Sequence, residues 1–229
     1  MKKETFQKLE NYMLLCMKDS AHDREHIYRV LYNALEIAAA ESNVDYDILI
    51  AACLLHDIGR QEQFQDPALC HAMVGGEKAY RFLTLQGFSQ EFCRRVRHCI
   101  ETHRFRKNNQ PQTIEAKILF DADKLDATGA IGIARTLMYK GNGAEPIYNF
   151  LPNGDISDGR QDTQPSFFRE YTFKLEKLYD KFLTSKGAQL ALQRREAAKA
   201  YYESLYREVS DGRREGQQKL RELAGEDEI

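Results

Sequence analysis

The sequence predicts an all-α fold. Hydrophobic residues recur at helical spacing through almost the whole chain, as in the stripe formed by Ile27, Val30, Leu31 and Ala34. No stretch combines sustained alternation of apolar and polar residues with hairpin turn signals at its ends. Of the 229 residues, 42% are hydrophobic and 30% are charged, which supplies enough apolar material for the core of one large domain.

Breaks rich in glycine or polar residues separate the expected helices. In chain order these helices cover residues 3–18, 23–41, 45–56, 71–86, 89–102 and 113 to about 140. The helix at 45–56 is apolar on most sides, which predicts a central position. Gly87 is a typical helix stop, and Gly59 is expected to end the helix that carries His56. Gly129 and Gly132 are expected inside the last of these helices, which indicates close packing against another backbone.

Residues 141–165 are rich in glycine, proline, asparagine and aspartate, which predicts a long loop that acts as a lid or a mobile connection. Residues 166–229 are expected to form two C-terminal helices. The first carries Phe168, Tyr171 and Leu175 on one stripe and the second starts near Gly187, with fraying expected after Asp211. Because no linker separates two cores, we expect residues 1–229 to form a single domain.

Composition argues against several classes of partner. A formal net charge of −2 gives no general electrostatic attraction to nucleic acid or to an anionic membrane. The N-terminus lacks the apolar region of a secretion signal, and the longest apolar run, residues 48–55, is too short to span a bilayer. The five cysteines lack CxxC spacing and suggest reduced thiols. We therefore expect a cytoplasmic protein without membrane or nucleic-acid partners.

Polar residues occur where the surrounding pattern predicts burial. His56 and Asp57 stand at the inner end of an apolar helix, and a buried carboxylate is normally paired or bound to a metal. The alternative is that Asp57 is a simple helix-end residue. His26 borders the buried stripe of its own helix, where the alternative is a core-edge histidine that hydrogen-bonds a backbone carbonyl.

Three aspartates, Asp121, Asp123 and Asp126, crowd onto a helix that is otherwise apolar. A solvated helix face is one interpretation, but the neighbouring Leu119 and Phe120 argue against solvation of all three. Two imidazole nitrogens and two carboxylate oxygens from three helices suit a divalent ion such as Mn²⁺, Fe²⁺, Co²⁺, Ni²⁺ or Zn²⁺. The residues alone leave open which of these aspartates is the ligand.

Five segments in this order resemble the HD-domain phosphohydrolase superfamily. They are AHDREHIYRV, AACLLHDIGR, HAMVGGEKA, CIETHRF and TIEAKILFDADKLDATGAIGIART. They are similar to the bacterial single-domain HD hydrolases related to nucleotide pyrophosphohydrolases. The resemblance is strong over residues 20–140 and looser over the C-terminal helices. It implies an HD-type helical bundle with one divalent ion (Mn, Fe, Co, Ni, Zn or Mg) held by His26, His56, Asp57 and Asp123. Asp123 is chosen because a basic residue and a leucine follow it, and Asp121 and Asp126 are the alternatives.

The resemblance also implies roles for residues around the ion. His71 or a neighbouring carboxylate such as Asp57 would take a proton from water, while Lys124 would meet a substrate phosphate. Further phosphate contacts are expected from Arg60, His103 and Arg104. Some HD proteins use additional histidines, at the positions of His71 and His103, for a second metal or for substrate. Arg60 stands where some HD nucleotidases have a glutamate that protonates the leaving group, so the general acid is not identified; a surface cation is the alternative for Arg60.

The resemblance implies metal-dependent hydrolysis of a phosphate ester or phosphoanhydride of a nucleotide, as in a (deoxy)nucleoside triphosphate pyrophosphohydrolase or a nucleotidase. One alternative is a regulatory module that binds a nucleotide or a metal without turnover. Another is a structural helical protein with a satisfied polar core. A homodimer is a further expectation from size and fold class.

Overall fold

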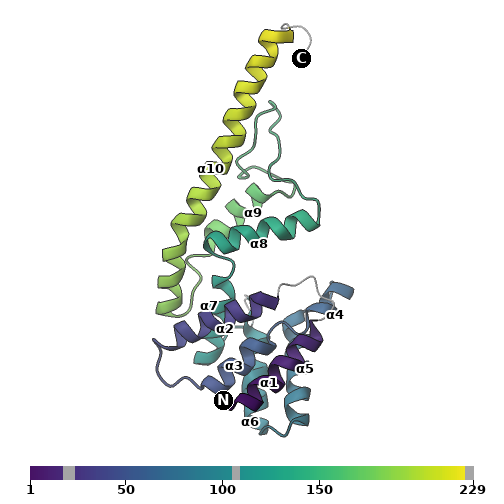
Figure 1. The fold of residues 1–229 in the computed structure, drawn as a ribbon, viewed down its shortest axis with the longest axis vertical. Coiled ribbons are helices and arrows are strands. Elements are labelled where there is room, and N and C mark those ends of the chain that lie inside the picture. The colour runs from purple at the N-terminus through teal and green to yellow at the C-terminus, as the bar shows by residue number, and fades with distance from the viewer. Residues whose placement is uncertain (18–23, 105–108, 225–229) are drawn as a thin grey trace. The chain divides into compact units, whose positions relative to one another are not determined.

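The structure is a computed structural model that describes residues 1–17, 24–104 and 109–224, and its regular elements are helices (Figure 1). They are α1 (Lys3–Cys16), α2 (Arg24–Ala38), α3 (Tyr46–Leu55), α4 (Arg60–Gln65), α5 (His71–Leu85), α6 (Gln90–Thr102), α7 (Ile114–Leu125), α8 (Gly129–Asn142), α9 (Phe167–Phe173), the 3₁₀ helix η1 (Leu175–Lys177) and α10 (Ser185–Ala224). Within these residues the only strand-like pairing is an isolated antiparallel bridge between Phe150 and Ile156. The predicted all-α fold is confirmed.

The chain divides into two compact units. The first consists of Met1–Asp126 and Phe182–Leu190, and the second of Ala127–Lys181 and Ala191–Ile229. Helices α1 to α7 belong to the first unit, whereas α8, α9 and most of α10 belong to the second. The assignment of residues 1–229 to a single domain stays a prediction.

Helix α3 lies at the centre of the first unit, where it contacts α1, α2, α5, α6 and α7. The Asp45 side chain caps its N-terminus by accepting hydrogen bonds from the backbone nitrogens of Asp47 and Ile48, at 3.1 and 3.2 Å. Seven of its ten residues are buried, as the uniformly apolar sequence predicts. Because α3 ends inside the core, the residues that follow it, His56 and Asp57, are buried as well.

Gly59 acts differently from the prediction. The sequence predicts that Gly59 ends the helix that carries His56, but α3 ends earlier, at Leu55, and Gly59, with a φ of −96°, is the residue before α4. A Cβ at this position would lie 2.4 Å from the carbonyl oxygen of His71 and 2.6 Å from the backbone nitrogen of Gly75. Glycine is therefore needed because the turn after α3 touches the backbone of α5, and this contact sets the distance between Asp57 and His71.

A Gly59→Ala variant is expected to lose roughly 1–3 kcal/mol of unfolding free energy, because the methyl group must push α5 away from the turn. Gly212→Ala is the matched control, since Gly212 lies within α10 and a Cβ there meets nothing within 4 Å. That control is expected to be neutral or stabilising. Urea denaturation of both variants checks the prediction, and equal stability of Gly59→Ala and the parent would contradict it.

The long helix expected from residue 113 to about 140 is interrupted. Helix α7 ends at Leu125, and α8 begins at Gly129. Gly129 has a φ of +63°, in the region that favours glycine, so it makes the turn into α8 and does not lie inside a continuous helix. At Gly132 a Cβ would lie 2.3 Å from the backbone of Ala127. The two glycines thus serve the break, which periodicity alone could not reveal because both helices share one apolar pattern.

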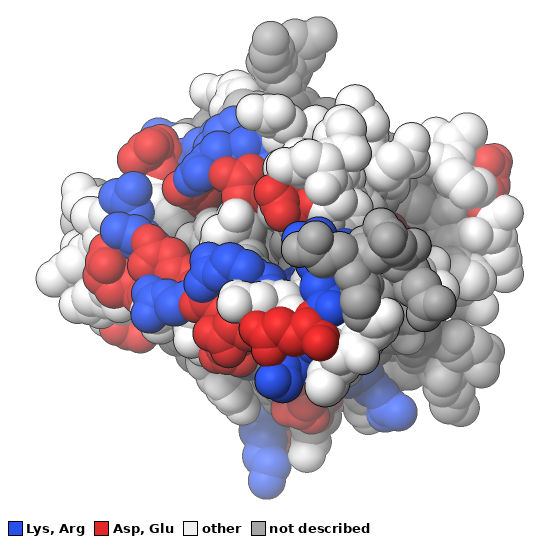
Figure 2. Space-filling model, turned by 90° about the horizontal axis from the view of Figure 1, so that it is seen from above, with Lys and Arg blue, Asp and Glu red and all other residues white. Residues whose placement is uncertain are grey.

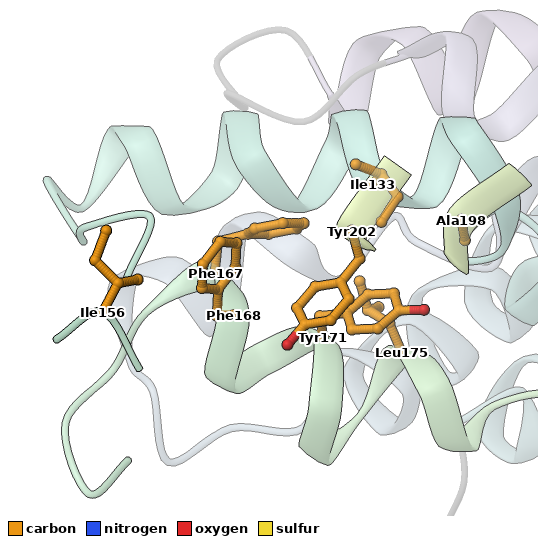
Figure 3. Close-up of a cluster of buried hydrophobic side chains, with 8 residues drawn as sticks. All are labelled: Ile133, Ile156, Phe167, Phe168, Tyr171, Leu175, Ala198 and Tyr202. Carbon is orange, nitrogen blue, oxygen red and sulfur yellow. The ribbon is translucent and has the colours of Figure 1, made fainter. Parts of the chain in front are cut away.

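Aromatic side chains fill the core of the second unit (Figure 3). The rings of Tyr171 and Tyr202 stack with centroids 4.1 Å apart, and Phe168 meets the edge of Tyr202 at 5.3 Å. Phe167 and Phe168 are completely buried. The Tyr202 hydroxyl donates a hydrogen bond to the Asp158 carbonyl at 2.5 Å. This bond connects the segment between α8 and α9, which contains Asp158, to α10.

The loop expected at residues 141–165 is confirmed as an irregular segment between α8 and α9, although α8 extends to Asn142; its role as a lid stays a prediction. Two other expectations were wrong. The helix after this loop splits into α9 and η1, so the stripe through Leu175 is not carried by one helix. The helix expected to fray after Asp211 continues to Ala224, where ion pairs such as Arg214–Asp211 at 2.7 Å support it.

Charged side chains of both signs share the surface. On the face drawn in Figure 2, basic and acidic residues lie next to one another, in keeping with 33 Lys and Arg against 35 Asp and Glu in the whole chain. Among the described residues, none of the helices combines the length and the hydropathy that crossing a membrane requires.

Candidate metal centre

Six side chains of the first unit converge on one cluster. They are His26 from α2, His56 and Asp57 from the turn after α3, His71 at the start of α5, His103 directly after α6, and Asp123 from α7. Five of them are buried, whereas the Asp123 side chain is 24% exposed. The cluster therefore meets solvent on the Asp123 side.

One half of the cluster contains the four ligands that the sequence predicts. The Nε2 atoms of His26 and His56 lie 3.4 Å apart, and Asp123 Oδ1 lies 3.2 Å from His26 Nε2 and 4.0 Å from His56 Nε2. Asp57 Oδ2 is 3.6 Å from both nitrogens. Ligand atoms bound to one ion at about 2.1 Å stand roughly 3.0–3.4 Å apart, so small movements would bring all four atoms onto a common ion.

The other half uses the second oxygen of the same carboxylate. Asp57 Oδ1 lies 3.4 Å from His71 Nε2 and 3.7 Å from His103 Nε2, and these two nitrogens are 3.3 Å apart. Asp57 thus lies between two groups of nitrogen and oxygen atoms. Its Oδ1 is also buried without a hydrogen-bond donor among the residues that the structure describes.

The hydrogen bonds of the four imidazole rings fix where their protons lie. In each ring Nδ1 faces an oxygen that can only accept: His26 faces Asp126 Oδ2 at 2.7 Å, His56 the Cys53 carbonyl at 2.8 Å, His71 Gln63 Oε1 at 2.5 Å, and His103 the Ile100 carbonyl at 2.6 Å. Gln63 is oriented by its Nε2, which donates to the Leu69 carbonyl. Nδ1 therefore carries a proton in each ring, and a neutral ring presents an Nε2 lone pair to the cluster.

This donor set fits a divalent metal ion. Lone pairs from four nitrogens and oxygens from two carboxylates meet in a largely buried space, and oriented imidazoles with carboxylates are typical ligands of transition metals. The carboxylates are in the required form. Although burial opposes ionisation of Asp57, its neighbours His56, Arg60 and His26 hold the pKa of this carboxyl well below its usual range. Burial likewise opposes ionisation of Asp123, but its hydrogen bond with His26 and the nearby imidazoles lower its pKa.

The histidines differ in their protonation. Burial lowers the pKa of His71 to about 2, with a further lowering by Arg60, and burial together with His56 lowers the pKa of His103 to about 4. Both rings are therefore neutral at pH 7. For His26 burial also acts to lower the pKa, but hydrogen bonds with Asp123 and Asp126 outweigh it and raise the pKa to about 9. Without a metal, His26 is thus protonated and donates to both carboxylates.

Asp126 and Arg29 hold the His26 ring in place. The buried Asp126 carboxylate accepts from His26 Nδ1 at 2.7 Å and from Arg29 Nε and Nη2 at 2.7 and 3.1 Å. A carboxylate behind a histidine fixes the ring orientation and strengthens the nitrogen on the other side as a ligand. Sequence reasoning missed Arg29, although it follows His26 by three residues and therefore shares its helix face.

Asp121, the other alternative ligand, is engaged elsewhere. Its carboxylate accepts hydrogen bonds from the backbone nitrogens of Leu183 and Thr184 and from the Thr184 hydroxyl, at 2.7 to 3.0 Å. It therefore fixes the segment before α10, and burial raises its pKa.

The predicted phosphate-binding cations lie in different surroundings. Arg60 Nε is 2.9 Å from Asp57 Oδ1, directly at the cluster. Arg104 Nη1 is 3.8 Å from Cys70 Sγ, next to His71 in the chain. The Lys124 amino group lies 3.6 Å from the centre of the Phe120 ring and 5.7 Å from that of Phe182.

Comparison with known proteins places the chain in a family. Residues 24–128 match the model of the HD domain. The protein YpgQ of Bacillus subtilis (strain 168) is 30% identical over 200 residues, which cover 86% of this chain and 88% of YpgQ. A crystal structure of Bacillus subtilis YpgQ in complex with ADP is 27% identical with a TM-score of 0.69, covering 90% of this chain and 95% of that chain.

A second solved structure has a similar degree of likeness. The HD-superfamily hydrolase from Bacillus thuringiensis is 29% identical with a TM-score of 0.70, and the match covers 91% of this chain and 98% of that chain. His26, the His56–Asp57 pair and Asp123 all fall inside the range matched by the HD-domain model. The chain therefore belongs to the HD-domain superfamily of metal-dependent phosphohydrolases.

Proposed function

We propose that this protein is a metal-dependent phosphohydrolase that cleaves a phosphate ester or phosphoanhydride bond of a nucleotide. The observation that carries the proposal is the convergence of four Nε2 atoms on two ionised carboxylates in one cluster. In a purely structural polar core each lone pair would accept a hydrogen bond from a donor. The six side chains of this cluster instead offer mainly acceptors once His26 loses its Nε2 proton.

The proposed ligands of one divalent ion are His26, His56, Asp57 and Asp123, with Mn, Fe, Co, Ni, Zn or Mg as the ion. The grouping of the His26, His56 and Asp123 ligand atoms supports this choice, as do the distances of 3.6 Å from Asp57 Oδ2 to both histidine nitrogens and the engagement of Asp121 by the backbone near α10. When bound, such an ion polarises a phosphoryl oxygen and lowers the pKa of water.

His71 is proposed as the residue that accepts a proton from the attacking water. Its Nε2 lone pair faces the cluster, and the Nδ1–H bond to Gln63 holds the ring in the required tautomer. A pKa of about 2 is too low for a general base at neutral pH. A bound phosphate adds negative charge, which raises the pKa of the imidazole toward the useful range. His71 would therefore act as a base only with substrate in place.

Cationic and neutral donors around the cluster are proposed to bind the substrate phosphates. Arg60 lies at the cluster, Arg104 lies beside Cys70, and Lys124 directly follows the proposed ligand Asp123. Positive charge at these positions would neutralise charge that develops on phosphoryl oxygens. His103 is proposed as a further substrate contact because its Nε2 lies 3.3 Å from that of His71.

A nucleotide is proposed as the substrate because YpgQ has been crystallised with ADP. We expect the metal-loaded chain to release phosphate or pyrophosphate from at least one ribo- or deoxyribonucleoside mono-, di- or triphosphate. Chelation is expected to reduce the rate by at least about 10³-fold, since the ion supplies the Lewis acid, and the added metal should restore it.

A colorimetric phosphate assay across nucleotides and across the six metals tests this prediction. Tight nucleotide binding without turnover under every condition would favour the alternative, a regulatory module that binds without catalysis. If nucleotides are neither bound nor cleaved, the protein has the family fold but not the proposed activity.

A further inference from the structure

The half of the cluster formed by Asp57 Oδ1, His71 and His103 has the spacing of a second metal site. Its three atom pairs are separated by 3.3, 3.4 and 3.7 Å. Both imidazoles donate Nδ1–H to an acceptor, so the Nε2 atoms are the ones that face Asp57 Oδ1. Geometry alone would therefore allow an ion here, beside the ion of the proposed function.

A guanidinium already faces the oxygen that such an ion would need. Arg60 is the first residue of α4, one turn after Asp57, and its Nε lies 2.9 Å from Asp57 Oδ1. The Arg60 side chain is 29% exposed, so it reaches inward from the surface. In the described part of the chain, Asp57 Oδ1 accepts no hydrogen bond. Its contact with Arg60 is therefore an ion pair.

We propose that Arg60 takes the place of a second metal ion, so that the protein binds one divalent ion and not two. This inference rests on the proposed function for the first ion. A guanidinium stays charged at all accessible pH values, so it does not leave the site by losing a proton. One positive charge beside Oδ1 balances the carboxylate, and the other two members of this half, His71 and His103, supply no negative charge that would attract a dication. An ion in this half would also lie next to the guanidinium and be repelled by it.

The number of bound ions per chain tests the inference. With excess Mn²⁺, followed by removal of the free ion and elemental analysis, the parent is expected to hold one ion per chain. Arg60→Gln, which keeps the length of the side chain without its charge, is expected to hold two. Arg60→Lys keeps the charge and is expected to hold one. Two Mn²⁺ ions that share the Asp57 carboxylate would also give the exchange-coupled electron paramagnetic resonance spectrum of a pair, in Arg60→Gln only.

Two further variants locate the effect. The double variant Arg60→Gln, His103→Gln is expected to return to one ion, because His103 is a ligand only in the half of the cluster that would hold the second ion. Arg81→Gln is the matched control, since Arg81 forms a surface ion pair with Glu77 at 2.7 Å, and it should hold one ion. Far-ultraviolet circular dichroism checks that each variant is folded.

Two ions in the parent, or one ion in a folded Arg60→Gln variant, would overturn the role of Arg60 while leaving the proposed function intact. No ion in the parent would overturn the metal-dependent function, and with it this inference.

Discussion

An Asp57→Asn variant is expected to lose its divalent ion and at least about 10³-fold of its phosphohydrolase activity, since the ion supplies the Lewis acid. Asp57 lies between the two halves of the cluster, with Oδ2 3.6 Å from His26 and His56 and Oδ1 3.4 Å from His71. The amide nitrogen of asparagine carries two protons and cannot bind a cation. It would also donate to the imidazole lone pairs that the ion needs.

The amide can satisfy those lone pairs, so metal content and not stability is the decisive measurement for Asp57→Asn. Elemental analysis of the purified variant and the phosphate-release assay report the two losses separately. Asp121→Asn is the matched control because it removes a buried carboxylate that is bonded to Leu183 and Thr184. Asp121→Asn should keep the ion but lose about 1–3 kcal/mol of unfolding free energy. One of the backbone N–H donors then faces the NH₂ group of asparagine, which cannot accept a hydrogen bond. Full metal content in Asp57→Asn would rule out its proposed role as a ligand.

Local patterns in the sequence were sufficient to predict most of the helices and the burial of His56 and Asp57, whereas the choice of Asp123 among three aspartates came from the resemblance to the HD-domain superfamily. The apolar run of α3 requires burial, and the residues at its inner end, His56 and Asp57, are buried with it. His26 borders the stripe of α2, and Asp123 lies on the helix that packs against α2. The placements of His26, His56 and Asp57 follow from helical periodicity, because local geometry fixes the face of the helix on which a side chain lies.

The remaining features depend on contacts between segments that are distant in the chain. Asp126 is bound to His26, a hundred residues earlier, and Gly59 is required by the backbone of α5 and not by its own turn. The break between α7 and α8 was hidden because the apolar pattern continues through it. The convergence of His71 and His103 on Asp57 needs the positions of α5 and α6 relative to α3, which periodicity does not define.

The affinity for a divalent ion is expected to rise steeply with pH, because His26 must release a proton before its Nε2 can bind. Its pKa is raised to about 9 by Asp123 and Asp126 against the effect of burial, so the protonated form dominates at neutral pH. Below that value each pH unit raises the apparent affinity about tenfold, because the ion competes with one proton. The gain is roughly fifty-fold from about pH 7 to about pH 9, whereas a histidine with an ordinary pKa near 6.5 would give almost none.

Titration calorimetry with Mn²⁺ at several pH values measures this slope, and repetition in buffers of different ionisation enthalpy counts the protons released. Asp126→Asn keeps an oxygen for His26 Nδ1 but removes a negative charge, so it should lower the pKa of His26 and move the pH-dependent rise in affinity to lower pH. Asp121→Asn, which does not touch His26, should leave the rise where it is in the parent. A flat affinity between about pH 7 and about pH 9 would show that ion binding releases no proton from His26, so that either its pKa is not raised or it is not a ligand. An unshifted rise in Asp126→Asn would instead mean that Asp123 and Asp57 are sufficient to hold the proton on His26.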